Sequence, residues 1–205
     1  MNELSKLNTK DRILNASIDL ISQKGFSGVS IREITRAVGI KESSLYNHFK
    51  TKDEILDVIF IQFIEEFSKT VPPVEMLDAI LENLGLEQFF EKGFENFKKH
   101  IDQPLNEKYW RILYIEHYRC KKIRDIFLQD IIKFTLDFLE IVFEKLIAKK
   151  MIKPLEARFL ASEYQYPMFS MLAEYNMLRF DQLDTSEIEN LMKKHMRFFI
   201  DNVRL

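Results

Sequence analysis

Apolar side chains recur at helical spacing along nearly the whole chain, and this pattern restricts the fold more than any other feature. In the first such stretch Ile13, Ala16, Ser17 and Leu20 are spaced as one face of a helix requires. Only five glycines and five prolines interrupt 205 residues, and the alternation typical of strands is hard to find. The sequence therefore predicts an all-α fold.

Helix-stopping residues divide these stretches. Gly25 and Gly39 stand where a left-handed residue follows a helix, so they end predicted helices over 9–24 and 30–38. Pro72 and Pro73 force an extended step and mark the best boundary in the chain. We expect a small helical domain over 1–52, a connecting helix over 53–70, and a larger helical domain over 71–205. In that last domain the predicted helices cover 75–84, 86–100, 106–120, 122–150, 155–180 and 185–203.

Charge and targeting features limit the class of protein. Residues 1–52 hold nine Lys and Arg against five Asp and Glu, a net charge of +4 in a chain of net charge −2. This asymmetry suggests a polyanionic partner for the N-terminal part, although an ordinary solvated face is an equal reading. The start "MNELSKLNTKDR" lacks the order of a secretory signal, and no apolar run reaches the ~20 residues of a membrane span. We expect a cytoplasmic protein without a disulfide, since Cys120 is alone.

A short segment between two capped helices carries the strongest functional signal. Ser30 with Glu33 and Thr51 with Glu54 each fit a capping box. Between them, residues 42–49 form a helix of about seven residues, too short to be stable without packing. At about 100° per residue, Leu45 and Phe49 lie on one side, and Ser43, Ser44, Tyr46 and Asn47 lie on the other.

Two helices joined by a glycine turn, the second anchored on its apolar side and polar on the other, form a helix-turn-helix arrangement. Such a second helix fits the DNA major groove, where Ser, Asn and Tyr reach base edges or phosphates. Hydroxyl-rich helical hairpins also occur as plain protein surface, so the pattern alone leaves both readings open.

The run "VSIREITRAVGIKESSLYNHFKTKDEIL" closely resembles the helix-turn-helix of the TetR (tetracycline-repressor-like) family of bacterial transcription regulators. The resemblance covers roughly residues 9–60. The residues that match the family pattern in order and spacing are Ser30, Ile34, Gly39, Ile40, Leu45, Tyr46, His48, Phe49, Lys52, Glu54, Ile55 and Leu56. Departures are Thr35 where Ala is usual, Val38 where a smaller residue is usual, and Lys41 where Ser or Thr would cap the recognition helix.

The resemblance implies a set of DNA contacts. They fall on Ser30, Arg32, Ser43, Ser44, Tyr46, Asn47, His48 and Lys52, and Lys41 is added as a candidate for a phosphate. Arg32 can fork onto guanine and Asn47 can pair with adenine, whereas Tyr46, His48 and Lys52 suit phosphates. Alternatively, Tyr46 and His48 support the small core, and Arg32 pairs with a nearby carboxylate.

In this family the C-terminal helices form a ligand cavity and a two-fold dimer interface, which the resemblance implies here. The predicted helix over 155–180 is apolar nearly all round, and Pro167 within it is expected to bend its axis and open a cavity. Candidate lining residues are Tyr109, Trp110, Leu113, Tyr114, His117, Tyr118, Phe134, Phe138, Tyr164 and Met168. Candidate interface residues are Tyr166, Phe169, Met177, Ile188, Met192, His195, Met196 and Phe199. Both sets have the alternative that they form only the core of the chain.

These features predict a homodimeric transcriptional regulator, a repressor that binds pseudo-palindromic operator DNA and is released by a small apolar or aromatic effector. The alternative is a helical protein-interaction module whose helix-turn-helix does not bind DNA. The scattered histidines, together with the lack of a phosphate-binding glycine loop and of a nucleophile elbow, argue against an enzyme. No cofactor, metal site or membrane partner is expected.

Overall fold

The computed structural model describes residues 7–205, so the first six residues of the predicted N-terminal domain lie outside it. In this described part the chain forms helices and no β-sheet, with one isolated antiparallel bridge between Ile152 and Arg204. The predicted all-α fold is therefore confirmed. None of the helices in residues 7–205 combines the length and the apolar character that crossing a membrane requires.

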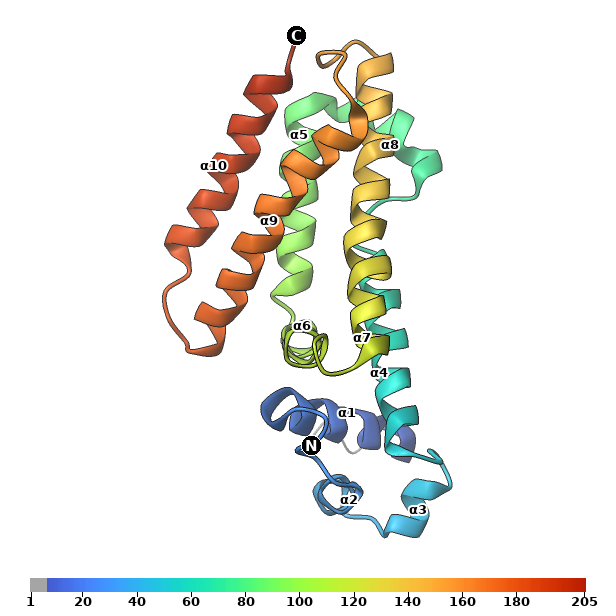
Figure 1. Cartoon of the computed structure of the whole chain (residues 1–205). Coiled ribbons are helices and arrows are strands. Elements are labelled where there is room, and N and C mark those ends of the chain that lie inside the picture. The colour runs from blue at the N-terminus through green and yellow to red at the C-terminus, as the bar shows by residue number, and fades with distance from the viewer. Residues whose placement is uncertain (1–6) are drawn as a thin grey trace. The chain divides into compact units, whose positions relative to one another are not determined.

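The described chain divides into two compact units (Figure 1). The first contains the residues up to Ser68 together with Ile101–Phe127, and the second contains Lys69–His100 and Leu128–Leu205. This division differs from the predicted boundaries, because residues 101–127 join the N-terminal helices instead of the C-terminal domain.

The first unit contains six α-helices. They are α1 (Thr9–Lys24), α2 (Ile31–Val38), α3 (Glu42–Tyr46), α4 (Lys52–Ser68), α6 (Pro104–Glu116) and α7 (Lys121–Ile126). Helix α1 packs against α2, α4 and α6, so it is the central element of this unit.

The second unit contains the remaining helices. After a 3₁₀ turn at Val74–Met76 come α5 (Leu77–Ile101), a π-helical segment (Phe127–Lys133), α8 (Phe134–Ala148), α9 (Ala157–Phe180) and α10 (Ser186–Val203). Helix α9 packs along α8 and α10, and α9 and α10 run antiparallel side by side (Figure 1).

Several predicted boundaries hold and others do not. Helices over 9–24 and 155–180 are found nearly as predicted, and α5 is broken at Gly85, where φ is 72°. The single helix expected over 122–150 is instead α7, the π-helical segment and α8. Helix α6 ends at Glu116 and not near 120, because the N–H groups of Arg119 and Cys120 both donate to the Glu116 carbonyl and close a turn. No glycine or proline marks that turn in the sequence.

Aromatic side chains of α4 and α6 form the core that joins these two helices. The ring centre of Phe63 lies 5.4 Å from that of Tyr109 and 5.5 Å from that of Trp110, and the ring centres of Phe67 and Trp110 are 5.9 Å apart. Edge contacts of this kind add to the free energy gained by burying the rings. Helices α4 and α6 are therefore held to one another inside the first unit.

The core of the second unit is a second aromatic cluster. The ring centre of Tyr164 in α9 lies 5.2 Å from that of Phe90 in α5 and 5.3 Å from that of Phe199 in α10. The ring of Phe143 in α8 stacks on that of Phe90. Burial of Tyr164 raises the pKa of its hydroxyl well above the usual range. These contacts from four helices set which faces of α9 and α10 are buried in the chain.

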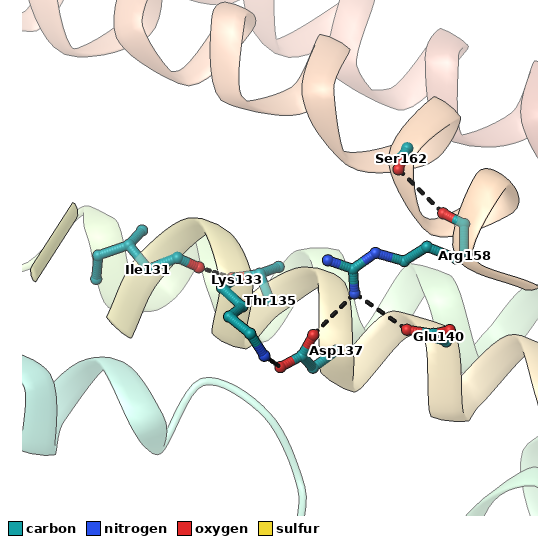
Figure 2. A network of polar contacts seen from close by, with 7 residues as sticks. All are labelled: Ile131, Lys133, Thr135, Asp137, Glu140, Arg158 and Ser162. Carbon is teal, nitrogen blue, oxygen red and sulfur yellow. Dashed lines mark hydrogen bonds and ion pairs between the residues drawn. The ribbon is translucent and has the colours of Figure 1, made fainter. Parts of the chain in front are cut away.

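A polar network ties the start of α9 to α8 (Figure 2). The Arg158 guanidinium donates to Asp137 Oδ1 at 2.8 Å and to Glu140 Oε2 at 3.0 Å. Lys133 also pairs with Asp137, and together these cations hold the pKa of the Asp137 carboxyl below its usual value, with the Lys133 hydrogen bond the larger cause. Because the pair is more than a third exposed on the Asp137 side, we expect it to fix the orientation of α9 more than it stabilises the fold.

Two exposed glycines offer a matched test of the backbone conformations that the structure assigns to them. Gly93 lies inside α5 and Gly39 adopts φ 75° after α2, and a Cβ at either position would meet no atom within 4 Å. Gly93→Ala should therefore raise the free energy of unfolding by about 1 kcal/mol, since alanine restricts the unfolded chain and favours helix. Gly39→Ala should lower the free energy of unfolding by about 1 kcal/mol. An alanine there would meet no neighbouring atom, but it is strained in the left-handed backbone conformation. Urea unfolding of both variants measures these changes, and equal effects would contradict the assigned backbone conformations.

Candidate nucleic-acid interface

The start of α2 is fixed by the predicted capping box. Ser30 N–H donates to Glu33 Oε2 at 2.8 Å, and Glu33 N–H donates to Ser30 Oγ at 3.2 Å. The Glu33 carboxylate also accepts from Lys24 Nζ at 2.8 Å, and Lys24 is the main reason that the pKa of Glu33 falls to about 2. The Ser30 hydroxyl is thus engaged with Glu33 while the residue remains at the exposed start of the helix.

The turn between α2 and α3 is held from α1. Gly39 adopts the left-handed conformation, with φ 75° and ψ 36°, and ends α2 as predicted. Arg12 Nη2 donates to the Val38 carbonyl at 2.5 Å, so a cation closes the C-terminal end of α2, where the helix dipole is negative. The sequence analysis missed Arg12, because its partner is a backbone carbonyl that no side-chain pattern reveals.

Helix α3 is pinned on one side by two buried side chains. Leu45 is 0% exposed and Phe49 is 1% exposed, and Lys10 Nζ lies over the Phe49 ring at 5.7 Å. Helix α3 has five residues, so this burial and not its own hydrogen bonding keeps it in place. The prediction that Leu45 and Phe49 anchor the segment is confirmed.

The polar candidates are displayed on the opposite side. Arg32, Lys41, Ser43, Tyr46, Asn47 and His48 are exposed, and Ser44 is half-buried. Tyr46 is 50% exposed, so it does not serve as a core support. Among the described residues Arg32 forms no ion pair, since the adjacent Glu33 is taken by Lys24. The exposed set combines base-reading and phosphate-binding chemistry on one short segment.

The segment differs from the predicted one in length. The helix expected over 42–49 ends at Tyr46, and Asn47 and His48 continue as a turn in which His48 N–H donates to the Leu45 carbonyl at 2.9 Å. Lys41 makes no capping hydrogen bond, as its chemistry predicts. Helix α3 is therefore weakly capped at both ends. Lys41 offers no acceptor side chain at its start, and the C-cap residue Asn47 adopts the right-handed conformation.

Lys52 has a different environment from the one its predicted phosphate role requires. Its Nζ donates to the carbonyls of Phe26 and Val29, both at 2.8 Å, and lies 4.1 Å from the centre of the Phe26 ring. An ammonium has three N–H donors, and two of them are used within the protein. We therefore revise the role of Lys52 to that of a tie between the start of α4 and the loop before α2.

The second predicted capping box is present in altered form. Thr51 Oγ1 accepts from Glu54 N–H at 3.1 Å, as expected. The Glu54 carboxylate, however, accepts from the N–H of Lys50 at 2.6 Å and not from that of Thr51. The start of α4 is capped by both residues, with the carboxylate reaching one residue further back.

The candidate effector residues divide between the two units. Tyr109, Trp110 and Leu113 are buried in the first unit, where burial, with a smaller effect of the Glu66 charge, raises the pKa of Tyr109 to about 12. Tyr118 is 83% exposed, which revises its predicted place in a cavity wall. Half-buried Tyr114 and His117 lie against Phe127, at 6.2 and 5.4 Å between ring centres.

The other four effector candidates belong to the second unit. Phe138, Tyr164 and Met168 are buried there, and Phe134 is half-buried. Tyr164 sits in the aromatic cluster of that unit, which is the core alternative weighed for it above.

The candidate interface residues are also divided. Ile188, Met192, Met196 and Phe199 are at most 8% exposed and pack inside the second unit, so they do not form an outer face of α10. His195 is tied to its own unit as well, because its Nε2 lies 2.9 Å from the Tyr164 carbonyl oxygen. Phe169 is half-buried.

An exposed apolar face nevertheless exists on α9 and α10. Tyr166 is 52% and Met177 63% exposed, as an interface role requires. Four further residues of this face, which lie outside the candidate interface set, are 50–69% exposed: Phe159, Phe180, Leu191 and Phe198. The candidate interface stripe of α10 is buried inside the second unit, where Phe199 packs on Phe143 and Tyr164.

The N-terminal helices match a known family of regulators. Residues 13–59 match the family described as bacterial regulatory proteins, tetR family. The chain is 36% identical over 66 residues to the "Probable HTH-type transcriptional regulator YttP" of Bacillus subtilis (strain 168), which covers 32% of each protein. It is 44% identical over 46 residues to the biofilm operon icaADBC negative transcriptional regulator IcaR of Staphylococcus epidermidis, covering 22% of this chain and 25% of that protein. These sequence matches thus cover a third or less of the length of each relative.

Solved structures match over nearly the whole chain. The flavonoid-responsive regulator FrrA has a TM-score of 0.65 at 18% identity and covers 96% of this chain and 97% of its own. A transcriptional regulator of Aquifex aeolicus VF5 has a TM-score of 0.63 at 22% identity and covers 93% and 96%. At these identities the likeness shows the fold.

The relatives are transcriptional regulators and not enzymes, which agrees with the expectation that this chain has no catalytic function. The helix-turn-helix matches by sequence and the chain matches by fold, so residues 13–59 belong to the tetR family of bacterial regulatory proteins, and the chain shares the fold of these solved regulators.

Proposed function

We propose that the protein binds pseudo-palindromic operator DNA as a cytoplasmic homodimer and represses transcription until a small apolar or aromatic effector releases it. The observation that carries the DNA-binding part is the segment of α3, a five-residue helix anchored by buried Leu45 and by buried Phe49 just beyond its end, while Ser43, Tyr46 and the C-cap residue Asn47 are exposed. Packing holds this short helix in place and leaves its outer polar face free to contact DNA.

The regulatory part is supported by the relatives. IcaR is a negative regulator and FrrA responds to flavonoids, which are flat aromatic molecules. By similarity we propose repression as the sign of regulation, and an effector with an apolar or flat ring system. Half-buried Tyr114, His117 and Phe127 offer ring faces suited to such a molecule.

Asn47 and Lys52 are expected to act differently in DNA binding. On a duplex selected from a random library, Asn47→Ala should cost about 1–3 kcal/mol and relax the preference at one base step. Lys52→Met should lower the free energy of unfolding and leave the salt slope nearly unchanged, because its ammonium is used inside the protein. Fluorescence anisotropy at several salt concentrations measures the affinity and the salt slope, urea unfolding measures the stability, and exposed Gln23→Ala on α1 is the control.

Wild-type protein that shows no salt-dependent DNA binding would overturn the proposal in favour of the protein-interaction module, because recognition of a protein does not follow counterion release. Asn47→Ala with unchanged base preference would move base reading away from this turn.

The dimer interface is proposed on the exposed face of α9 and α10. Phe198 and Leu191 are seven residues apart, so they lie on one side of α10, and both are at least 50% exposed. Exposed large apolar side chains that gather on adjacent helices mark an association surface. To enter successive major grooves, the two copies of α3 in a dimer have to lie about 34 Å apart.

Phe198→Asp should produce a folded monomer. The substituted side chain is exposed in the single chain, so the fold loses little, whereas in a dimer it would bury an unpaired charge at a cost of several kcal/mol. Sedimentation velocity measures the mass, and Tyr118→Asp, at an exposed aromatic position of the first unit, is the control. An intact dimer for Phe198→Asp would place the interface elsewhere.

Effector binding is expected to depend on Tyr114 and not on Tyr118. Flavonoids and related aromatic compounds would be titrated against the DNA complex and the free protein. Tyr114→Ala should weaken a ligand that releases DNA by about tenfold, whereas exposed Tyr118→Ala should leave its affinity unchanged. A ligand that binds free and DNA-bound protein equally tightly cannot shift the equilibrium and would contradict an effector role.

A further inference from the structure

Glu116 is a buried carboxylate in an unfavourable position. Its side chain is 3% exposed, and it is the last residue of α6, where the negative end of the helix dipole repels an anion. The nearest cation, Arg119 Nη1, lies at 3.9 Å on a side chain that is 64% exposed. The surroundings of residue 116 therefore do not explain why a carboxylate is present there. The hydrogen-bond partner of Glu116 does.

That partner is the backbone of the loop that precedes the helix-turn-helix. Phe26 N–H donates to Glu116 Oε1 at 2.8 Å across ninety residues of sequence. The close approach of Glu116 to Phe26 requires a glycine at position 25. Gly25 has φ 74° and ψ 163°, and a Cβ there would lie 3.0 Å from the same Glu116 oxygen.

Lys52 repeats the arrangement with opposite charge. It is the first residue of α4, where the positive end of the helix dipole disfavours a cation, and its Nζ donates to the Phe26 carbonyl at 2.8 Å. Phe26 is thus held at its N–H by an anion and at its C=O and ring by a cation. Two charges that are each misplaced on their own helix are both satisfied by one loop residue.

We infer that Glu116 is a positioning residue for the DNA-binding residues: with Lys52 it fixes Phe26, and through Phe26 it sets where Ser30 and Arg32 at the start of α2 are held. Val29, which accepts the second hydrogen bond of Lys52, directly precedes Ser30. A displacement at the end of α6 therefore reaches α2 through a chain of three hydrogen bonds.

This inference rests on the proposed function where it concerns regulation. Glu116 lies between Tyr114 and His117, the proposed effector contacts. A ligand that shifts either ring moves the last turn of α6, and Glu116 transmits that shift to Phe26. Lys108–Asp19 also joins α6 to α1, but both of its side chains are more than a third exposed, so it is a weak tie.

The first test is amide hydrogen exchange of Phe26, followed by NMR in the free protein. In the wild type this amide should be protected although it lies in a loop. Glu116→Gln keeps an acceptor oxygen and should retain the protection, whereas Glu116→Leu should lose it by roughly tenfold or more. An unprotected Phe26 amide in the wild type would overturn the inference even if Glu116→Leu does not fold.

The second test is DNA affinity at a temperature well below unfolding. Glu116→Leu should weaken binding of the selected duplex by about 3- to 30-fold, and Glu116→Gln should restore it. Lys108→Ala, which removes the exposed tie between α6 and α1, should bind DNA as the wild type does. A purely structural role of Glu116 would lower the unfolding temperature and leave the affinity of the folded protein unchanged, and that result would overturn the inference.

The two proposals fail in different ways. If the wild type binds no DNA, the proposed function fails, and amide exchange and the backbone chemical shifts of Ser30 and Arg32 in Glu116→Leu still decide the inference. Shifts at Ser30 and Arg32 equal to those of the wild type would overturn it. If the wild type binds DNA and Glu116→Leu binds equally well, only the inference fails.

Discussion

The burial of Leu45 and Phe49 is the constraint on which the reading of this protein depends. Helix α3 has five residues, and a helix of that length has no stability of its own in water. Two apolar anchors, with Lys10 lying over the Phe49 ring, convert it into a fixed platform. Because the anchors occupy one side, the polar residues from Ser43 to His48 are left on the exposed side, where a base or phosphate can meet them.

The rest of the first unit supports this platform with charges bonded to backbone atoms. Arg12 donates to the Val38 carbonyl, Lys52 to those of Phe26 and Val29, and Glu116 accepts from Phe26 N–H. Each of these bonds is made to a backbone group at a helix end or in a loop, where the hydrogen bonds of the helices do not continue. The unit that contains the DNA-binding candidates therefore includes α6 and α7, and a change in α6 acts inside the same compact body.

Helices α9 and α10 show how far an apolar pattern can be interpreted. The spacing of Ile188, Met192, Met196 and Phe199 predicted a buried stripe, and that stripe is buried. It packs on the chain's own aromatic cluster around Tyr164, and the exposed face carries Leu191 and Phe198. The spacing of apolar residues shows that a helix face is buried, but it does not show which other element covers that face.

The sequence by itself determined the all-α class, the capping box at Ser30 and Glu33, the stop at Gly39 and the inward anchors of α3. These depend on residues within a few positions of each other, so local chemistry is sufficient to predict them. Only the tertiary structure decided that α6 ends at Glu116, that Lys52 is turned inward and that residues 101–127 join the N-terminal unit. The bonds of Lys52 and of Glu116 to the loop before α2 join partners 23 to 90 residues apart, whereas the end of α6 is a local turn closed by the N–H groups of Arg119 and Cys120. In all of them the partners are backbone atoms, which every residue has and no sequence pattern distinguishes.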